Sequence, residues 1–289
     1  MTNAIHNRAM LVSLKLSKWS ATKYDKKVSL EIAKQHNADA DAGRYNKRLI
    51  GKGKNSYAEL MTLFGALYAE HVKQTLPWSD EGWRILPNAN HGPYTAMVRD
   101  KRYQIETALE AFLLDYPALQ AHTKATSNGL YNPADFPSVI DLRKRFGVKV
   151  HYSPIPAGED FRVELDTATL QEIARDTEDR VNRAVMEAQA DTFERLHKCV
   201  EHIAEVLSEK KPRIFDSMME NARELTNVLT RLNVTDDPRL EELRKRVEKL
   251  AQVDSEALRT LPYTRKRTAS EAQSILDSMN AAFGQVVNA

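Results

Sequence analysis

The sequence contains little of what disulfide-bonded, secreted or membrane proteins require. Cys199 is the only cysteine among 289 residues, which excludes an intrachain disulfide and a metal site built on cysteine pairs. No run of 18 uncharged apolar residues is present, so no membrane-spanning helix is expected. Residues 1–10 are polar and lack the apolar centre of a signal peptide. These absences together predict a soluble cytoplasmic protein.

Motifs of common enzyme classes are also missing. Neither the Gly-x-Ser-x-Gly nucleophile turn nor the glycine pattern of dinucleotide-binding folds occurs. The segment Gly51-Lys52-Gly53-Lys54-Asn55-Ser56 resembles a phosphate-binding loop, but that motif requires a glycine five residues before its Gly-Lys pair. Asn46 and Arg48 stand at those positions, and Asn55 follows the second lysine where serine or threonine is needed. The segment therefore predicts a basic loop that contacts phosphate, not a nucleotide hydrolase.

A metal or catalytic centre is not indicated by spacing either. His197, Cys199 and His202 share a predicted helix, but the two histidines are five residues apart, whereas metal-binding pairs on a helix are three or four apart. Cys199 instead fits a small buried side chain. We therefore predict no catalytic residue, no metal and no cofactor. One enzymatic alternative remains, in which acidic loop residues converge only in the fold: Asp80, Glu81, Asp135 and Asp160.

Charge is unevenly distributed along the chain. Residues 1–54 carry 12 Lys and Arg against 4 Asp and Glu, and residues 166–260 carry 16 against 21, although the whole chain has a net charge of only +2. This basic N-terminal segment favours a localised anion-binding face. The alternative is an ordinary solvated surface facing the acidic half of the same chain.

Aromatic side chains lie between these cations. Lysine and arginine bind the phosphates of nucleic acid, and aromatic rings stack on unpaired bases. The alternative is that Trp19 and Tyr24 anchor this segment in the core while the lysines remain solvated. The candidate nucleic-acid-binding residues are Lys15, Lys18, Lys23, Lys26, Lys27, Arg44, Tyr45, Lys47, Arg48, Lys52 and Lys54.

Periodicity predicts a mixed domain over residues 1–165. Alternating apolar residues indicate strands near 10–18, 83–86, 148–152 and 161–165, the last two as a hairpin. Helical spacing indicates a short helix after an Asp25 cap that holds Val28, Ile32 and Ala33, helices at about 56–74, 93–114 and 138–146, and a further helix and loop over 117–137. Gly147 is expected to end the helix of residues 138–146. Trp78 and Trp83 are expected to be core anchors because their neighbours are apolar.

Residues 166–289 show only helical patterns. An apolar stripe runs from Leu170 to Leu207, and further helices are expected after Pro212 and after Asp237. A weaker amphipathic helix covers residues 270–289, and the basic residues 265–267 are expected in a linker before it. The fold class predicted is α+β and predominantly helical: a small mixed sheet covered by helices, followed by a C-terminal antiparallel helical bundle or coiled-coil arm.

Three segments resemble a family of uncharacterised proteins of tailed phages and prophage-like elements, a domain of unknown function. They are Asp41-Ala42-Gly43-Arg44-Tyr45-Asn46-Lys47, residues 75–87 (TLPWSDEGWRILP) and Asp160-Phe161-Arg162-Val163. The resemblance covers about residues 11–207. It implies a phage setting in the cytoplasm of a bacterial host, and it transfers no active-site residue.

The leading hypothesis is a non-enzymatic nucleic-acid-binding protein of phage DNA metabolism, of the single-strand binding or annealing type. Its partner would be single-stranded DNA or another polyanion. The first alternative is a protein-interaction adaptor or scaffold, for an AAA+ ATPase or for a second copy of the chain, that uses the C-terminal helices. The second is the enzyme with converging carboxylates described above.

Overall fold

The computed structural model describes residues 5–78, 82–158, 166–210 and 212–286, and divides the chain into two compact units. Unit 1 comprises residues 1–13, 71–95 and 151–289, and unit 2 comprises residues 14–70 and 96–150. This division differs from the boundary expected at residue 165, because unit 1 collects segments from both halves of the sequence. The strand expected at 161–165 lies outside the described residues.

Four elements contribute residues to both units. They are the strands β1 (Ala9–Ser17) and β6 (Gly147–Ser153) and the helices α3 (Ser56–Lys73) and α4 (Asn88–Ser127). Each begins in one unit and ends in the other, so the chain changes unit within regular secondary structure and not in loops. Both strands, expected near 10–18 and 148–152, are confirmed.

A small sheet forms one part of unit 1. Residues Ala9–Val12 of β1 pair antiparallel with β5 (Arg84–Pro87), which pairs in turn with the two-residue strand β4 (Leu76–Pro77). The strand order is β4-β5-β1-β6. Trp78 is buried and Trp83 packs partly buried against the same apolar core, which confirms both as anchors.

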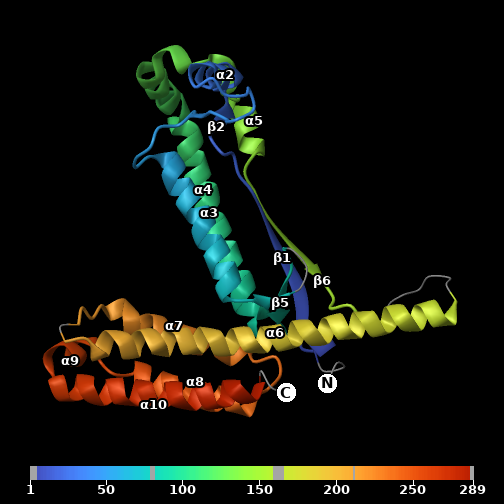
Figure 1. Ribbon diagram of the computed structural model, residues 1–289, viewed down its shortest axis with the longest axis vertical. Helices are drawn as coiled ribbons and strands as arrows, with labels where there is room; N and C mark the ends of the chain where they lie inside the picture. Colours follow the sequence, from blue (N-terminus) through green and yellow to red (C-terminus); the bar gives the residue numbers. More distant parts are fainter. Residues whose placement is uncertain (1–4, 79–81, 159–165, 211, 287–289) are drawn as a thin grey trace. The chain divides into compact units, whose positions relative to one another are not determined.

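The C-terminal helices of unit 1 form the expected bundle, with α10 packed against α6 and α7 against α8 (Figure 1). The apolar stripe of α6 is buried within it, including Val181, Leu196 and Leu207. Asp237 caps α8 by accepting a hydrogen bond from the Arg239 amide, as the Asp-Pro start signal predicts. The helices are α6 (Thr167–Ser208), α7 (Asp216–Leu232), α8 (Pro238–Ala251), α9 (Ser255–Thr260) and α10 (Pro262–Val286).

Two sequence expectations for these helices are wrong. The basic residues 265–267 lie inside α10 and not in a linker, because the helix already begins at Pro262, a residue that suits a first helical turn. Helix α7 begins at Asp216 and not at Pro212, so that Phe215 stands at its N-cap and is exposed. No helix of the described residues is long and apolar enough to cross a membrane.

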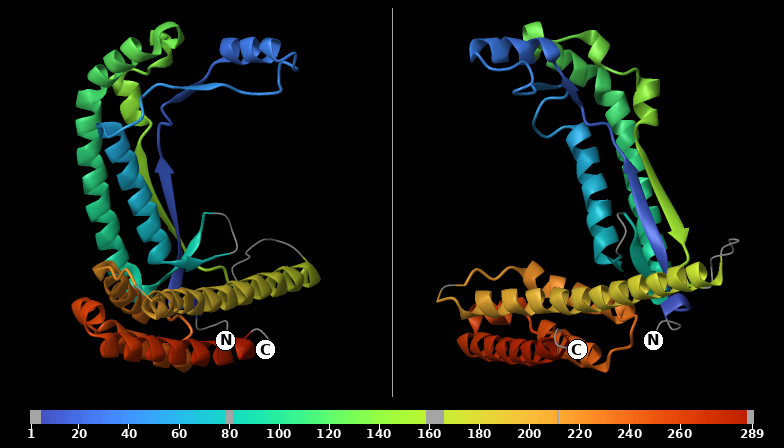
Figure 2. Two further views of the ribbon diagram at one scale, coloured as in Figure 1. Left: turned by 60° about the vertical axis from the view of Figure 1, so that its left-hand side comes forward. Right: turned by 45° about the vertical axis from the view of Figure 1, so that its right-hand side comes forward.

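Unit 2 is built on α3 and α4, which lie side by side (Figures 1 and 2). Asn55 caps α3 by accepting a hydrogen bond from the Ala58 amide, and apolar residues at helical spacing face inward. Aromatic rings fill the space between the helices and β1: Trp19, Tyr57 and Phe112 have centroids 5.5–6.4 Å apart. Unit 2 thus has an aromatic core.

Helix α4 continues through Pro117, where the sequence predicts two separate helices. Proline costs one backbone hydrogen bond inside a helix and bends it without necessarily ending it. Figure 2 shows α4 bending in its last third. Burial on both sides of the proline, at Phe112, Tyr116 and Thr123, keeps the chain helical.

The remaining elements of unit 2 are short. Helix α2 (Lys26–Gln35) is capped by Asp25 as expected, and α5 (Val139–Lys144) is capped by Ser138 and ends at Arg145, so that Gly147 opens β6 and is not the cap. Strands β2 (Thr22–Tyr24) and β3 (Asn46–Arg48) form a separate two-stranded ribbon, which the sequence pattern does not predict. Two short 3-10 helices follow α4: η1 (Asn128–Leu130) and η2 (Pro133–Asp135).

Candidate nucleic-acid interface

Positive and negative charges are divided more clearly between the two units than between the two halves of the sequence. Unit 2 holds 19 Lys and Arg against 12 Asp and Glu, a formal charge of +7, which leaves unit 1 at −5. All the candidate binding residues belong to unit 2. Most of them lie on residues 18–55, which we call the basic excursion. Figure 2 shows it projecting from the pair α3–α4 with α2 near its tip.

The ribbon of β2 and β3 sorts its side chains onto two faces. Thr22 pairs with Arg48 and Tyr24 with Asn46, while Lys23 pairs with Lys47 between them. Directly opposed residues of an antiparallel pair share a face, and successive residues alternate. Arg48, Tyr24 and their partners therefore occupy one face, and the two lysines occupy the other.

Lys47 is held within unit 2 and does not serve as a free phosphate contact. Its ammonium lies 3.0 Å from a carboxylate oxygen of Asp25 and 2.8 Å from one of Asp135, and it donates a 2.9 Å hydrogen bond to the Leu130 carbonyl. Only 11% of its side chain is exposed. Burial of the ammonium opposes its charged form, but the hydrogen bonds to Asp135 and Asp25 outweigh this and raise the pKa of Lys47. The sequence candidate Lys47 is thus a structural residue.

Two other candidates are positioned by local contacts. The Arg44 guanidinium lies over the Tyr24 ring, 4.6 Å from its centroid, a cation–π contact that leaves the tyrosine 37% exposed. The Tyr45 amide donates to the Ser29 hydroxyl, and its carbonyl accepts from the Asp25 amide, so the residue is fixed against α2. Tyr24 and Arg44 thus present a combined aromatic and cationic surface.

The other lysines of the set are exposed. Lys15 and Lys18 lie on or just after β1, and Lys26 and Lys27 occupy the first turn of α2. A cation at a helix N-terminus is disfavoured by the helix dipole, so the two α2 lysines add no helix stability there. Both are exposed, and Lys27 is at 4.0 Å from a carboxylate oxygen of Glu31 one turn further along the helix.

The glycine-lysine loop leads into α3 as expected. Gly53 adopts a φ of +130°, a conformation that non-glycine residues rarely adopt, and Lys52 and Lys54 on either side of it are exposed. Arg48 and Lys52 line a cavity of about 340 Å³ beside this loop. The loop therefore places cations and free backbone close together.

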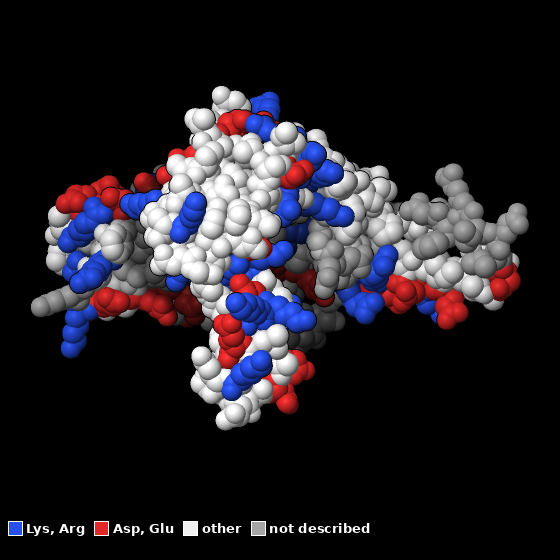
Figure 3. Space-filling model, turned by 90° about the horizontal axis from the view of Figure 1, so that it is seen from above, with Lys and Arg blue, Asp and Glu red and all other residues white. Residues whose placement is uncertain are grey.

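The sequence leaves open that Trp19 and Tyr24 are core anchors, and this holds for Trp19 alone. Trp19 is buried in the aromatic core, and its carbonyl accepts a hydrogen bond from the Tyr57 hydroxyl at 2.8 Å. Tyr24 is exposed. On the face in Figure 3, Lys and Arg side chains occur in small groups among uncharged and acidic surface.

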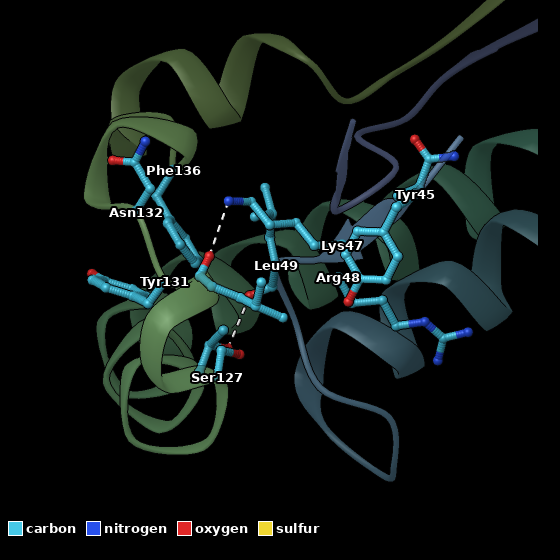
Figure 4. Close-up of a pocket in the computed structure, with 11 residues that line it drawn as sticks. Tyr45, Lys47, Arg48, Leu49, Ser127, Tyr131, Asn132 and Phe136 are labelled. Carbon is cyan, nitrogen blue, oxygen red and sulfur yellow. Dashed lines mark hydrogen bonds between the residues drawn. The ribbon is translucent and has the colours of Figure 1, made fainter. Parts of the chain in front are cut away.

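A second cavity, the ribbon cavity, lies between β3 and the segment after α4. Its volume is about 320 Å³ (Figure 4). Sequence reasoning identified only three of its residues, Tyr45, Lys47 and Arg48. The others carried no common motif because they come from separate segments. The lining is Tyr45, Asn46, Lys47, Arg48, Leu49, Thr123, Ser127, Leu130, Tyr131, Asn132 and Phe136.

Of the acidic residues considered for an enzyme, Asp135 lies within the described residues, where it is paired with Lys47. Asp80, Glu81 and Asp160 lie outside the described residues. Within the described part of the chain, no group of three or more His, Cys, Asp and Glu is placed to hold a metal. Burial raises the pKa of the Cys199 thiol to about 11, so it is a poor nucleophile.

Comparisons of the chain with family models, with curated proteins and with solved structures gave no match.

Proposed function

We propose that unit 2 binds single-stranded nucleic acid without catalysis, through the basic excursion. The observation that carries this proposal is the formal charge of +7 on unit 2, with exposed cations and an exposed aromatic ring on the same segment. Cations neutralise phosphates in a sequence-independent way, and rings stack on bases that are not paired. The phage setting implied by the sequence resemblance belongs to this proposal as well.

The spacing of the cations favours a flexible strand over a duplex. On the face shown in Figure 3, lysines and arginines occur in small groups and do not form one broad surface. A single strand can bend to meet separate groups, whereas a duplex presents phosphates on a fixed helix. Tyr24 with Arg44 above its ring offers a stacking platform beside the phosphate contacts.

The test is a salt titration of binding to labelled single- and double-stranded oligonucleotides. We expect complexes at micromolar protein in low salt, with affinity that falls as salt rises. Replacing Lys23, Arg48 and Lys52 with alanine together should weaken binding and reduce the slope of log affinity against log salt by about 2, since each single-strand phosphate contact contributes about 0.7.

A matched control replaces three exposed cations of unit 1: Lys249→Ala, Lys266→Ala and Arg267→Ala. This variant loses the same formal charge and should bind like the parent. An equal loss of affinity in both triple variants would mean that binding depends on the net charge of the protein and not on the basic excursion. Absence of any complex at micromolar protein in low salt would overturn the proposal.

A second candidate function, protein association through unit 1, is favoured by a different observation. The buried stripe of α6 is unavailable for it, but Phe215, Leu261 and Tyr263 are 67%, 53% and 78% exposed. They lie near one another because Arg259 donates to the Ile214 carbonyl and pairs with Asp216. Association would be supported if sedimentation shows a mass that rises with protein concentration, and if the double variant with Phe215→Ser and Tyr263→Ser stays monomeric. A parent protein that is monomeric at all concentrations would contradict it.

A further inference from the structure

The ribbon cavity is enclosed by residues of opposite character. Tyr45, Tyr131 and Phe136 supply aromatic walls, and the Tyr131 and Phe136 rings lie 5.4 Å apart. Ser127 adds a hydroxyl that can donate and accept hydrogen bonds. A volume of about 320 Å³ falls at the lower end of the range for small-molecule sites. The cavity therefore suits a planar ligand with polar edges.

Charge inside this region selects against an anion. The Lys47 ammonium at the cavity is already neutralised by two carboxylates, those of Asp25 and Asp135. An anionic group entering beside Lys47 would find the ammonium already paired with both carboxylates, whereas an uncharged heterocycle needs no such partner. The ligand part that enters is consequently uncharged.

Arg48 lies at the edge of the ribbon cavity, where it could contact a negatively charged part of the same ligand that stays outside the cavity. Arg48 lines the ribbon cavity and also the neighbouring cavity beside Lys52. In Figure 4 its side chain points away from Lys47, as the alternation of the ribbon requires. An uncharged planar group inside and a phosphate at Arg48 together describe a nucleotide.

We infer that the ribbon cavity receives one unpaired base of a bound strand, while Arg48 and Lys52 contact its phosphates. This inference rests on the proposed function, and it specifies the site at which a base of the bound strand is held. Bases in a duplex are stacked and paired and reach such a cavity only at the cost of unstacking. The cavity thus adds to the preference for single over double strands.

The experiment fills the cavity and leaves every charge in place. Ser127→Phe places a ring into the lining, and Ala125→Phe places the same ring on an exposed position of the same helix as the matched control. Each protein is titrated with an oligothymidylate and with an abasic deoxyribose-phosphate oligomer of equal length. We expect the parent and Ala125→Phe to prefer the oligothymidylate, and we expect this preference to be about tenfold smaller in Ser127→Phe, because one stacked base contributes about that factor beyond any stacking on Tyr24.

A second pair of variants guards against misfolding of Ser127→Phe. Tyr131→Phe keeps the ring and should retain the parent's preference, whereas Tyr131→Leu should reduce it as Ser127→Phe does, with circular dichroism confirming that both are folded. The two proposals fail separately. If Ser127→Phe and the parent show the same preference between the two oligomers, the cavity does not hold a base although the strand is bound. If neither oligomer binds at low salt, the proposed function itself fails.

Discussion

Two arginines of unit 1 and two of unit 2 are used in opposite ways. In unit 1, Arg195 donates to the carbonyls of Val72, Lys73 and Thr75, the C-terminal end of α3, and Arg84 donates to the same end. Cations are favourable there because the free carbonyls carry partial negative charge. In unit 2, Arg48 and Arg44 stand on the exposed excursion. Formal charge therefore indicates a binding surface only where the cations are not already used to satisfy backbone groups.

The cores differ as well. Unit 1 is held by long aliphatic stripes on its bundle, and unit 2 by aromatic rings. The three tryptophans allow the units to be followed separately, because Trp19 belongs to unit 2 and Trp78 and Trp83 to unit 1. A Trp19→Phe variant reports unit 1 by fluorescence, and a variant with Trp78→Phe and Trp83→Phe reports unit 2.

The largest expected difference between the units comes from Leu196, which is fully buried in the α6 stripe. Leu196→Asp would bury an uncompensated carboxylate and should destabilise unit 1 by several kcal/mol. Urea unfolding followed with the unit 1 reporter measures this. Met186→Asp, at an exposed position of the same helix, is the control and should change stability little. Equal unfolding midpoints for the two variants would show that the stripe is assigned to the wrong face.

A second difference should appear on acidification. His71 is buried in unit 1, where its Nδ1 lies 2.8 Å from the Tyr94 hydroxyl, and burial, with the nearby Arg84 charge, lowers its pKa from 6.5 to about 4. The unfolded chain takes up this proton below pH 6.5, whereas the folded chain does not. Unit 1 should therefore be fully stabilised above pH 6.5 and lose about 3 kcal/mol between pH 6.5 and 4.

Unfolding of the unit 1 reporter in urea at several pH values tests this. His71→Gln removes the titrating group, so its stability should change less between pH 7 and 4.5. A parent protein with equal stability at both pH values would contradict the assignment of a neutral, buried imidazole.

The smallest effect is expected in unit 2 at more extreme pH. The hydrogen bond from Lys47 lowers the pKa of Asp25 below 3.8, so its contribution is present above that value and is lost as the pH falls further. The pKa of Lys47 is raised above 10.5, so its contribution is present below that value and is lost at higher pH. Lys47→Met should destabilise the unit 2 reporter at pH 7 and reduce both losses. A parent and variant with the same pH profile would show that the pair of carboxylates does not hold the ribbon.

The long helices and the strand β1 could be predicted because their apolar periodicity extends over many residues. The ribbon could not, since strands of three residues are too short to show alternation. Pro117 misled the prediction because burial on both sides of it, visible only in the fold, keeps α4 helical. Helix caps at Asp25 and Asp237 were predictable because a cap depends on residues adjacent in sequence.

The candidate site was only partly predictable for a related reason. The eleven candidate residues do fall in one unit, but their availability depends on distant partners. Lys47 is neutralised by Asp135, which is 88 positions away in the sequence and carries no signal of that pairing. The aromatic wall of the ribbon cavity comes from Tyr131 and Phe136, which follow α4 in a segment without a recognisable motif.

The discontinuous make-up of unit 1 sets the order in which the chain can reach its folded state during translation. A nascent chain that has emerged through residue 150 already holds every residue of unit 2. Unit 1 can fold only after α6 to α10 have been synthesised. Arg8 likewise forms its ion pair only once Asp236 has emerged. Contacts over such separations are slow to form. Until they form, the first strand and the segment of residues 71–95 expose apolar surface that unit 1 later covers, and this interval is when the chain is most prone to aggregate.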